Sequence, residues 1–139
     1  MTETSRWHAF SGAPLEEPYG YSRAVRVDDR IVVAGCAPIW PDGSCDPDPR
    51  IQARRCLEII RAALEELGGA LSDVVRTRMY ITDAAFGAAV GEAHGEAFRD
   101  VRPATSMVVV AGLLDPRWKV EMEAEAVVGS WGQTPKAAS

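Results

Sequence analysis

Residues 118–128, with the sequence WKVEMEAEAVV, constrain the fold more than any other segment because apolar and charged side chains alternate along it. Strict alternation is typical of a β-strand that is buried on one face only. The apolar row consists of Val120, Met122, Ala124 and Ala126, and the opposite row consists of Lys119, Glu121, Glu123 and Glu125. The segment therefore predicts a strand whose apolar row lies under helices and whose acidic row lies on the other face of a sheet.

Two helices are predicted to supply that cover. The first begins at Asp48 and Pro49, because an aspartate accepts hydrogen bonds from the free amides of the first turn and a proline there has no amide to leave unpaired. Its apolar stripe consists of Cys56, Ile60, Ala63, Leu64 and Leu67. It ends at Gly68, and a second helix is predicted over residues 82–98, where apolar residues recur at near-helical spacing.

The remaining regular segments are predicted to be strands. Residues 21–27 and 30–37 are rich in β-branched residues and form an antiparallel hairpin around an Asp-Asp turn. Residues 74–81 and 105–113 are strands, and a short extra strand is expected near residues 7–10. The order β-β-α-β-α-β-β indicates an α+β domain with a single sheet, and two helices can cover only one face of it.

The strand at residues 105–113 is apolar on both sides, which a sheet with one open face does not explain. Its two rows are Met107, Val109 and Ala111 on one side, and Ser106, Val108 and Val110 on the other. A strand that is apolar on both faces is normally covered on both. We therefore expect a symmetric oligomer in which further copies of the chain supply the missing cover.

Composition limits the domain organisation and the location. The chain has 139 residues, of which 47% are hydrophobic, as expected for a globular protein with one core. We expect one domain over residues 7–130, with flexible ends at residues 1–6 and 131–139, where small and polar side chains offer little to bury. No apolar segment approaches the roughly 20 residues that cross a bilayer, and no export signal is visible, so we expect no membrane partner and a cytoplasmic protein.

Charge and motif spacing argue against several classes of partner. The net charge is −5 and the basic residues are dispersed, so we expect no nucleic-acid partner. The three cysteines lack paired spacing, which argues against a disulfide framework and a zinc site and fits a reducing compartment. His8 and His94 are isolated, and no glycine-rich nucleotide fingerprint follows a strand. We therefore expect no metal and no organic cofactor, and neither histidine is assigned a catalytic role.

Five stretches in this order resemble the Rid family, also called YjgF or reactive intermediate deaminases. They are PYGYSRAV (18–25), VAGCAPI (33–39), RTRMYITD (76–83), FRDVRPATSMVVV (98–110) and KVEMEAEA (119–126). The resemblance covers residues 19–128. It implies a chorismate-mutase-like, YjgF-like α+β domain assembled as a homotrimer, with three equivalent clefts between subunits.

The resemblance also implies a catalytic glutamate and reveals a missing arginine. In deaminase members, an arginine after a Pro-Ala pair clamps the substrate carboxylate, and a glutamate on the last strand orients water. Glu121 matches that glutamate, but Thr105 occupies the arginine position. A neutral hydroxyl in place of a bidentate guanidinium costs about 1–3 kcal/mol, which is about ten- to hundredfold in affinity. The chain thus resembles a subgroup that lacks the arginine and is not expected to be an efficient 2-aminoacrylate deaminase.

The candidate site residues differ in how they contribute. Glu121 is the catalytic candidate, because a partly desolvated carboxylate exchanges a proton with water near neutral pH; the alternative is an ion pair with Arg78 or Lys119. Arg23 and Arg78 either restore an anion site or pair with the acidic row. Tyr21 either stacks on a flat ligand or walls the pocket.

Four more residues complete the predicted ligand site. Thr105 and Ser106 supply hydroxyls, and backbone amides near Cys36 are candidates to hold a ligand oxygen. Met107 shapes the pocket, since a thioether packs well and does not titrate. None of these residues lies in a motif typical of a serine nucleophile.

The sequence therefore predicts a small-molecule ligand and leaves three functions open. The leading one is a cofactor-independent hydrolase or deaminase of an imine, enamine or related carbonyl-derived metabolite. The alternative is a non-catalytic trimer that binds a metabolite or a partner protein in the same clefts. Ribonuclease activity is the least favoured because of the acidic charge and the absence of a histidine pair.

Overall fold

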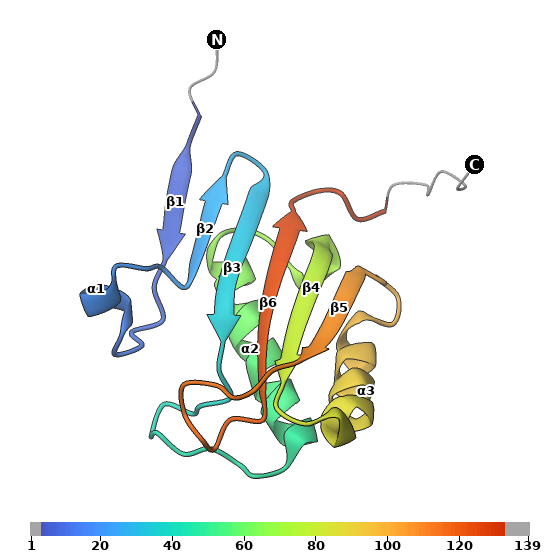
Figure 1. Ribbon diagram of the computed structural model, residues 1–139. Coiled ribbons are helices and arrows are strands. Elements are labelled where there is room, and N and C mark those ends of the chain that lie inside the picture. The colour runs from blue at the N-terminus through green and yellow to red at the C-terminus, as the bar shows by residue number, and fades with distance from the viewer. Residues whose placement is uncertain (1–3, 133–139) are drawn as a thin grey trace.

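The structure is a computed structural model that describes residues 4–132. Its strands are β1 (Arg6–Ala9), β2 (Ala24–Val27), β3 (Arg30–Cys36), β4 (Val74–Ile81), β5 (Ala104–Val109) and β6 (Val120–Val127). The helices are α1 (Glu16–Tyr19), α2 (Pro49–Glu66) and α3 (Gly87–Phe98), with short 3-10 helices at Leu71–Asp73 and Ala84–Phe86. The strands form one mixed sheet in the order β1-β2-β3-β6-β4-β5, and α2 and α3 lie together behind it (Figure 1). The predicted α+β fold, with a single sheet and two helices on one face, is confirmed.

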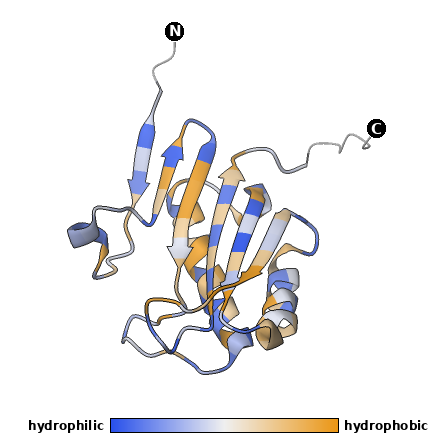
Figure 2. Ribbon diagram, viewed as in Figure 1, coloured by the Kyte–Doolittle hydropathy of each residue, from blue (hydrophilic) through white to orange (hydrophobic). Residues whose placement is uncertain are grey.

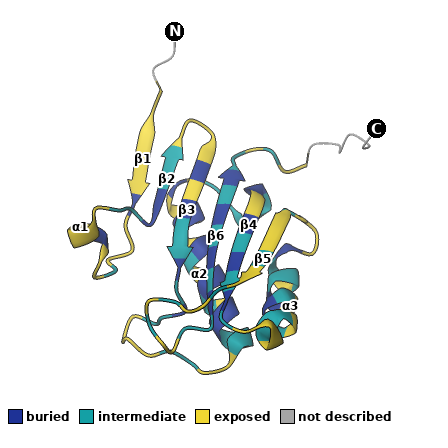
Figure 3. Ribbon diagram, viewed as in Figure 1, coloured by how far each residue is buried: buried dark blue, intermediate teal, exposed yellow. Residues whose placement is uncertain are grey.

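Strand β6 lies in the middle of the sheet, between β3 and β4, and runs antiparallel to both. Its apolar row is buried under the helices, and its three glutamates lie half-buried on the open face, as the alternation predicts. Figure 2 shows the alternation of hydrophilic and hydrophobic residues along β4 and β6. Figure 3 shows that the outer strands β1 and β5 are largely exposed, whereas β6 alternates between buried and half-buried residues.

Helix α2 begins and ends where its sequence signals predict. The carboxylate of Asp48 accepts a hydrogen bond of 2.8 Å from the amide of Arg50, and Pro49 is the first helical residue. At the other end, Gly68 has a φ of +83°, a left-handed conformation that only glycine adopts readily. Arg26 of β2 donates a hydrogen bond of 2.7 Å to the carbonyl of Leu67, so a cation stabilises the carboxyl end of the helix.

Several predicted boundaries are wrong. The first hairpin strand begins at Ala24 rather than at residue 21, and the helix α1, which precedes it, was not predicted. The second helix begins at Gly87, because Asp83 caps the short 3-10 helix instead. Strand β5 ends at Val109 rather than at residue 113, because β4, its one neighbour within residues 4–132, ends at Ile81, the partner of Val109 in the register.

The described part of the chain begins close to a short strand at its amino end. The expected extra strand near residues 7–10 is present as β1, which already begins at Arg6. Residues 1–3 and 133–139, which belong to the predicted flexible ends, lie outside the described residues. Within residues 4–132, no helix has the length and apolar character required to cross a membrane.

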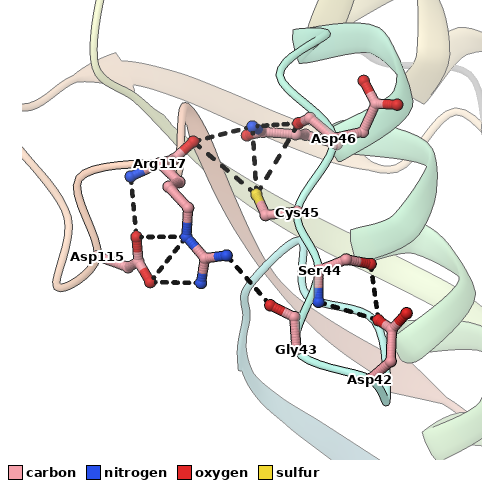
Figure 4. A network of polar contacts seen from close by, with 8 residues as sticks. Asp42, Gly43, Ser44, Cys45, Asp46, Asp115 and Arg117 are labelled. Carbon is pink, nitrogen blue, oxygen red and sulfur yellow. Dashed lines mark hydrogen bonds and ion pairs between the residues drawn. The ribbon is translucent and has the colours of Figure 1, made fainter.

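Two loops at one end of the sheet are joined by a polar network (Figure 4). Arg117, from the loop before β6, forms an ion pair of 2.8 Å with Asp115 and donates a hydrogen bond of 3.1 Å to the carbonyl of Gly43. The buried side chain of Gln52 in α2 donates to the Arg117 carbonyl at 3.0 Å and accepts from the Lys119 amide at 2.7 Å. These contacts fix the chain immediately before β6, and therefore the start of the strand that carries Glu121.

Candidate functional site

Glu121 lies where the pairing of β3 and β6 becomes irregular. The register of the two strands shifts between Val33 and Cys36, and the Glu121 side chain extends over this irregularity. A Cβ atom at Gly35 would be 2.4 Å from Oε1 of Glu121, a distance that real Cβ atoms essentially never show. The carboxylate therefore occupies space that exists only because residue 35 is a glycine.

The Glu121 carboxylate is a partly buried acid without a partner. Within residues 4–132 it makes no hydrogen bond or close ion pair. Burial raises the pKa of Glu121, the charge of Arg23 lowers it and that of Glu123 raises it, so that the net shift is upward. Lys119 donates instead to the carbonyl of Pro47 at 2.6 Å, so the ion pairs considered from sequence are not formed. This carboxylate can therefore accept a hydrogen bond from water or from a ligand.

Arg23 also contacts Gly35 and is only 7% exposed. Its Nη1 donates to the carbonyl of Gly35 at 2.6 Å and approaches Sγ of Cys36 at 3.5 Å, while its Cζ lies 5.8 Å from the centre of the Tyr21 ring. Its Nε is buried and has no hydrogen-bond partner among the described residues. We call Tyr21, Arg23, Gly35, Cys36 and Glu121 the Glu121 cluster.

Glu16 supports this cluster and was missed by the sequence analysis. Its carboxylate lies 3.7 Å from Nε of Arg23 and accepts hydrogen bonds from the Ser11 hydroxyl and from the amides of Ser11 and Gly12, each amide at 3.2 Å. Burial alone would raise the pKa of Glu16, but these hydrogen bonds and the charge of Arg23 lower it overall. The sequence gives no periodic or motif signal for Glu16. Its partners Ser11 and Gly12 lie in an irregular loop, and Arg23 lies beyond the turn that follows Glu16.

Cys36 belongs to the Glu121 cluster as a neutral thiol. The side chain is buried, and burial raises its pKa to about 11 against the opposing charge of Arg23. A thiol with this pKa carries almost no thiolate at neutral pH, and the thiolate is the nucleophilic form. Cys36 can therefore contribute packing and a weak polar contact at this site.

Arg78, the other candidate arginine, has a partner outside the Glu121 cluster. Its Nη1 lies 3.1 Å from Oε1 of Glu123, and the same oxygen accepts a hydrogen bond of 2.8 Å from the Tyr80 hydroxyl. Arg78 and Glu123 border a hollow of about 80 Å³ on the open face of the sheet. Arg78 thus pairs with the acidic row, one of the two alternatives left open from sequence.

Thr105, Ser106 and Met107 lie on β5, away from the Glu121 cluster within one chain. In the register, Glu121 pairs with Tyr80 and Tyr80 with Val108, so one strand separates β5 from β6. Ser106 pairs with Arg78 and shares its face of the sheet, whereas the side chains of Thr105 and Met107 point to the helix side.

The helix side of β5 has its own polar cluster. Thr105 Oγ1 lies 2.8 Å from Thr77 Oγ1, which in turn lies 2.8 Å from Nε2 of His94. Met107 lies beside this group, against the glycines of α3. We call Thr77, His94 and Thr105 the Thr105 cluster. Sequence reasoning assigned no role to His94, because its contact with Thr105 depends on how α3 packs against the edge of the sheet.

The described residues hold no group of three side chains suited to bind a metal ion. The chemistry that the two clusters offer is therefore that of a desolvated carboxylate, a buried guanidinium, hydroxyls and an imidazole. These groups can orient water, move a proton and donate hydrogen bonds to a ligand oxygen.

Comparison with known proteins gives the family. The family model described as Endoribonuclease L-PSP matches residues 13–128. A RutC family protein of Pyrococcus abyssi is 39% identical over 114 residues, which cover 79% of this chain and 88% of that protein. The crystal structure of a YjgF/YER057c/UK114 family member from Mycobacterium tuberculosis is 44% identical, has a TM-score of 0.83 and is matched over 89% of this chain and 100% of its own.

A second solved structure is that of TdcF from Escherichia coli with bound serine. It is 27% identical with a TM-score of 0.74, and the match covers 86% of this chain and 92% of that one. The similarity extends over nearly all the residues from which the fold and the two clusters are built. The chain belongs to the YjgF family, also called the Rid family.

Proposed function

We propose that this protein is a cofactor-independent hydrolase of small imines or enamines, with Glu121 as the catalytic acid-base group. Water adds to the imine carbon while Glu121 accepts a proton from it, and proton transfer to nitrogen then allows the C–N bond to break. The products are a carbonyl compound and ammonia. The observation that carries this proposal is the Glu121 carboxylate, which is half-buried, unpaired in the described chain and raised in pKa by its burial.

The same proposal requires a homotrimer. The Glu121 cluster and the Thr105 cluster are separated within one chain. A cleft between subunits would place the Glu121 cluster of one protomer against the Thr105 cluster of its neighbour. The exposure of Val108 and Val109, at 45% and 57%, leaves apolar surface on β5 for a neighbouring copy to cover. Ser106 and Met107 would then line the cleft beside Thr105.

Arg23 rather than Arg78 is proposed to supply positive charge to the cleft. Arg78 is held by Glu123 at 3.1 Å, whereas Arg23 approaches its partner Glu16 only to 3.7 Å, and its charge acts on Glu121. The serine bound to TdcF supports a ligand of amino-acid size. Thr105 cannot form the two parallel charged bonds of an arginine, so 2-aminoacrylate is proposed to be a poor substrate.

Ammonia release from a panel of freshly generated imines, with 2-aminoacrylate among them, tests this function. Glu121→Gln keeps the size of the side chain and removes its basicity, and should lower turnover of the best substrate by about 100-fold or more. Rapid hydrolysis of 2-aminoacrylate by the wild type would refute the role given to Thr105. Turnover that is unchanged in the Gln variant would refute the role of Glu121.

A second candidate function is a trimer that binds a metabolite without converting it. It is favoured by one observation, the hydroxyl of Thr105, which is already bonded to Thr77 at 2.8 Å. One measurement distinguishes the two functions. Ligand binding without turnover in the wild type, with unchanged affinity in Glu121→Gln, would support the binding module.

A further inference from the structure

A continuous chain of hydrogen-bonding groups connects α3 to the surface of β5. Nε2 of His94 lies 2.8 Å from Thr77 Oγ1, Thr77 Oγ1 lies 2.8 Å from Thr105 Oγ1, and Thr105 Oγ1 lies 3.1 Å from the carbonyl oxygen of Pro103. Thr77 is only 1% exposed, and the half-buried imidazole of His94 also packs on the Phe98 ring at 4.7 Å. Thr105, at the outer end, is exposed. The chain thus has a buried middle and one end that a ligand can reach.

The acceptor at the outer end favours one direction of the whole chain. The Pro103 carbonyl can only accept, so the single hydroxyl hydrogen of Thr105 points to it. Thr105 must then accept the hydrogen of Thr77, and Thr77 must accept a hydrogen from Nε2 of His94. If Nε2 carried no hydrogen, Thr77 would donate to His94 and Thr105 would have to donate to Thr77, which leaves the Pro103 carbonyl without the Thr105 hydrogen. The Nε2–H form is the one that satisfies all three contacts.

Because the His94 imidazole is neutral, its tautomer decides which of its two nitrogens donates a hydrogen bond. Burial lowers the pKa of His94 below its ordinary value of 6.5 and is the sole cause of the shift, so no charged side chain of the described chain acts on the ring. Thr77 of β4 and Thr105 of β5 contact Nε2 of the ring, Phe98 of α3 packs against it, and none of these three groups titrates near neutral pH. At pH 7 the direction of the hydrogen bonds therefore depends on the tautomer alone.

We propose that His94 is a positioning residue that acts through Thr77 to present the Thr105 hydroxyl as a hydrogen-bond donor to an oxygen atom of the ligand. This inference rests on the proposed function, because it places Thr105 in the ligand cleft. On binding, the Thr105 hydrogen turns from the Pro103 carbonyl to a carbonyl or carboxylate oxygen of the ligand. Thr105 still accepts the hydrogen of Thr77, and hydrogen bonds in such a chain polarise one another, which strengthens the terminal donor.

The chain explains how a threonine contributes to recognition where an arginine is missing. A lone exposed hydroxyl rotates and serves as donor or acceptor with equal ease. A hydroxyl that already accepts from Thr77 offers its hydrogen in one direction. The site then selects a ligand with an accepting oxygen at this point, and a neutral carbonyl satisfies it as well as a carboxylate does.

The first test is the tautomer of His94 in the full-length protein, measured by ¹⁵N NMR of the imidazoles at pH 7.5. The chain has two histidines, so the His8→Gln variant assigns the signals. The expected result is a neutral ring with its hydrogen on Nε2. A neutral ring with its hydrogen on Nδ1 would overturn the inference, whether or not the protein hydrolyses imines.

The second test compares two replacements of His94 in binding pyruvate, a probe with a ketone and a carboxylate oxygen. Glutamine places an amide N–H near the position of Nε2, whereas phenylalanine retains a ring and removes the donor. We expect His94→Phe to weaken pyruvate binding by about two- to tenfold, the effect of one neutral hydrogen bond. His94→Gln should retain most of the affinity.

Thr77→Val provides an independent break in the same chain and does not require a change in α3. It should reproduce the loss in His94→Phe, and thermal unfolding of each variant verifies that it is folded. Equal affinity in wild type and His94→Phe, equal loss in His94→Gln, or no pyruvate binding by the wild type would each overturn the inference. A protein that releases no ammonia but shows the expected tautomer and the expected contrast in binding would refute only the proposed hydrolase.

Discussion

The Glu121 cluster and the Thr105 cluster bury polar groups in opposite ways. In the Glu121 cluster the carboxylate makes no hydrogen bond within the described chain, and the buried Nε of Arg23 has no hydrogen bond there, only an ion pair of 3.7 Å with Glu16. In the Thr105 cluster every hydroxyl has a partner, and no group carries a charge at neutral pH. Buried charges without full compensation are costly for folding and typical of functional sites. The difference supports the proposal that the chemistry occurs at the first cluster and that the second orients a ligand.

The largest expected effect comes from removing the space that the Glu121 cluster needs. Gly35→Ala places a Cβ atom 2.4 Å from Oε1 of Glu121 and must displace the carboxylate. We expect turnover in the ammonia-release assay to fall by about 100-fold, since a shift of about 1 Å at a reacting group has effects of this size.

The matched control lies at the other cluster. In Gly91→Ala the new Cβ meets Cε of Met107 at 3.7 Å, an ordinary contact, so turnover should stay within a few-fold of the wild type. Equal losses in the two variants would break the distinction between the clusters.

The next effect is on stability. Glu16→Gln removes the charge that faces Arg23 and turns amide hydrogens toward the donors of Ser11 and Gly12. We expect the free energy of unfolding at pH 7 to fall by about 2–3 kcal/mol, measured by urea denaturation. Thr77→Val, which breaks neutral hydrogen bonds, should cost about 1 kcal/mol.

The two variants should also differ in their dependence on pH. The pKa of Glu16 in the folded chain is lowered from 4.5, so this group contributes stability above 4.5 and the contribution is lost as the pH falls through the lowered value. The loss caused by Glu16→Gln should therefore shrink below pH 4.5, whereas the loss caused by Thr77→Val should not change over that range. A constant loss in both variants would contradict the role of the Glu16 charge.

The smallest effect is a displacement of the pH profile of turnover. Glu121 must be ionised to accept a proton from water, and burial raises its pKa above the ordinary value of 4.5. The acid limb of kcat/KM should therefore lie above pH 4.5, and it should be unchanged in His94→Phe because that variant alters only the neutral cluster. An acid limb at or below pH 4.5 would contradict the claim that burial raises the pKa of Glu121.

The sequence predicted well the elements whose signals are local. The alternation over residues 118–128 predicted which side chains of β6 are buried, and Asp48 with Pro49 predicted the start of α2. Boundaries failed where pairing with a distant strand decides them. The end of β5 at Val109 is an example, because it follows from the end of β4.

The candidate site was predicted in part for the same reason. Glu121, Arg23, Cys36 and Tyr21 were chosen from sequence, and the fold brings them together around Gly35. Thr105 was chosen as well, but its contacts with Thr77 and His94 were not predictable, since strand alternation does not say which residue of a helix lies against an edge strand. Glu16 was missed because its hydrogen bonds arise in an irregular loop.

The sequence by itself determined that β6 turns an apolar row to one face of the sheet and an acidic row to the other, because the side-chain direction along a strand follows from backbone geometry. It also determined the family, through five short stretches in a fixed order. Only the tertiary structure decided that Arg23 and Glu121 both lie at Gly35 and that His94 and Thr105 meet at Thr77. Those contacts join residues far apart in the chain, and they depend on the shift in register between β3 and β6 and on the position of α3.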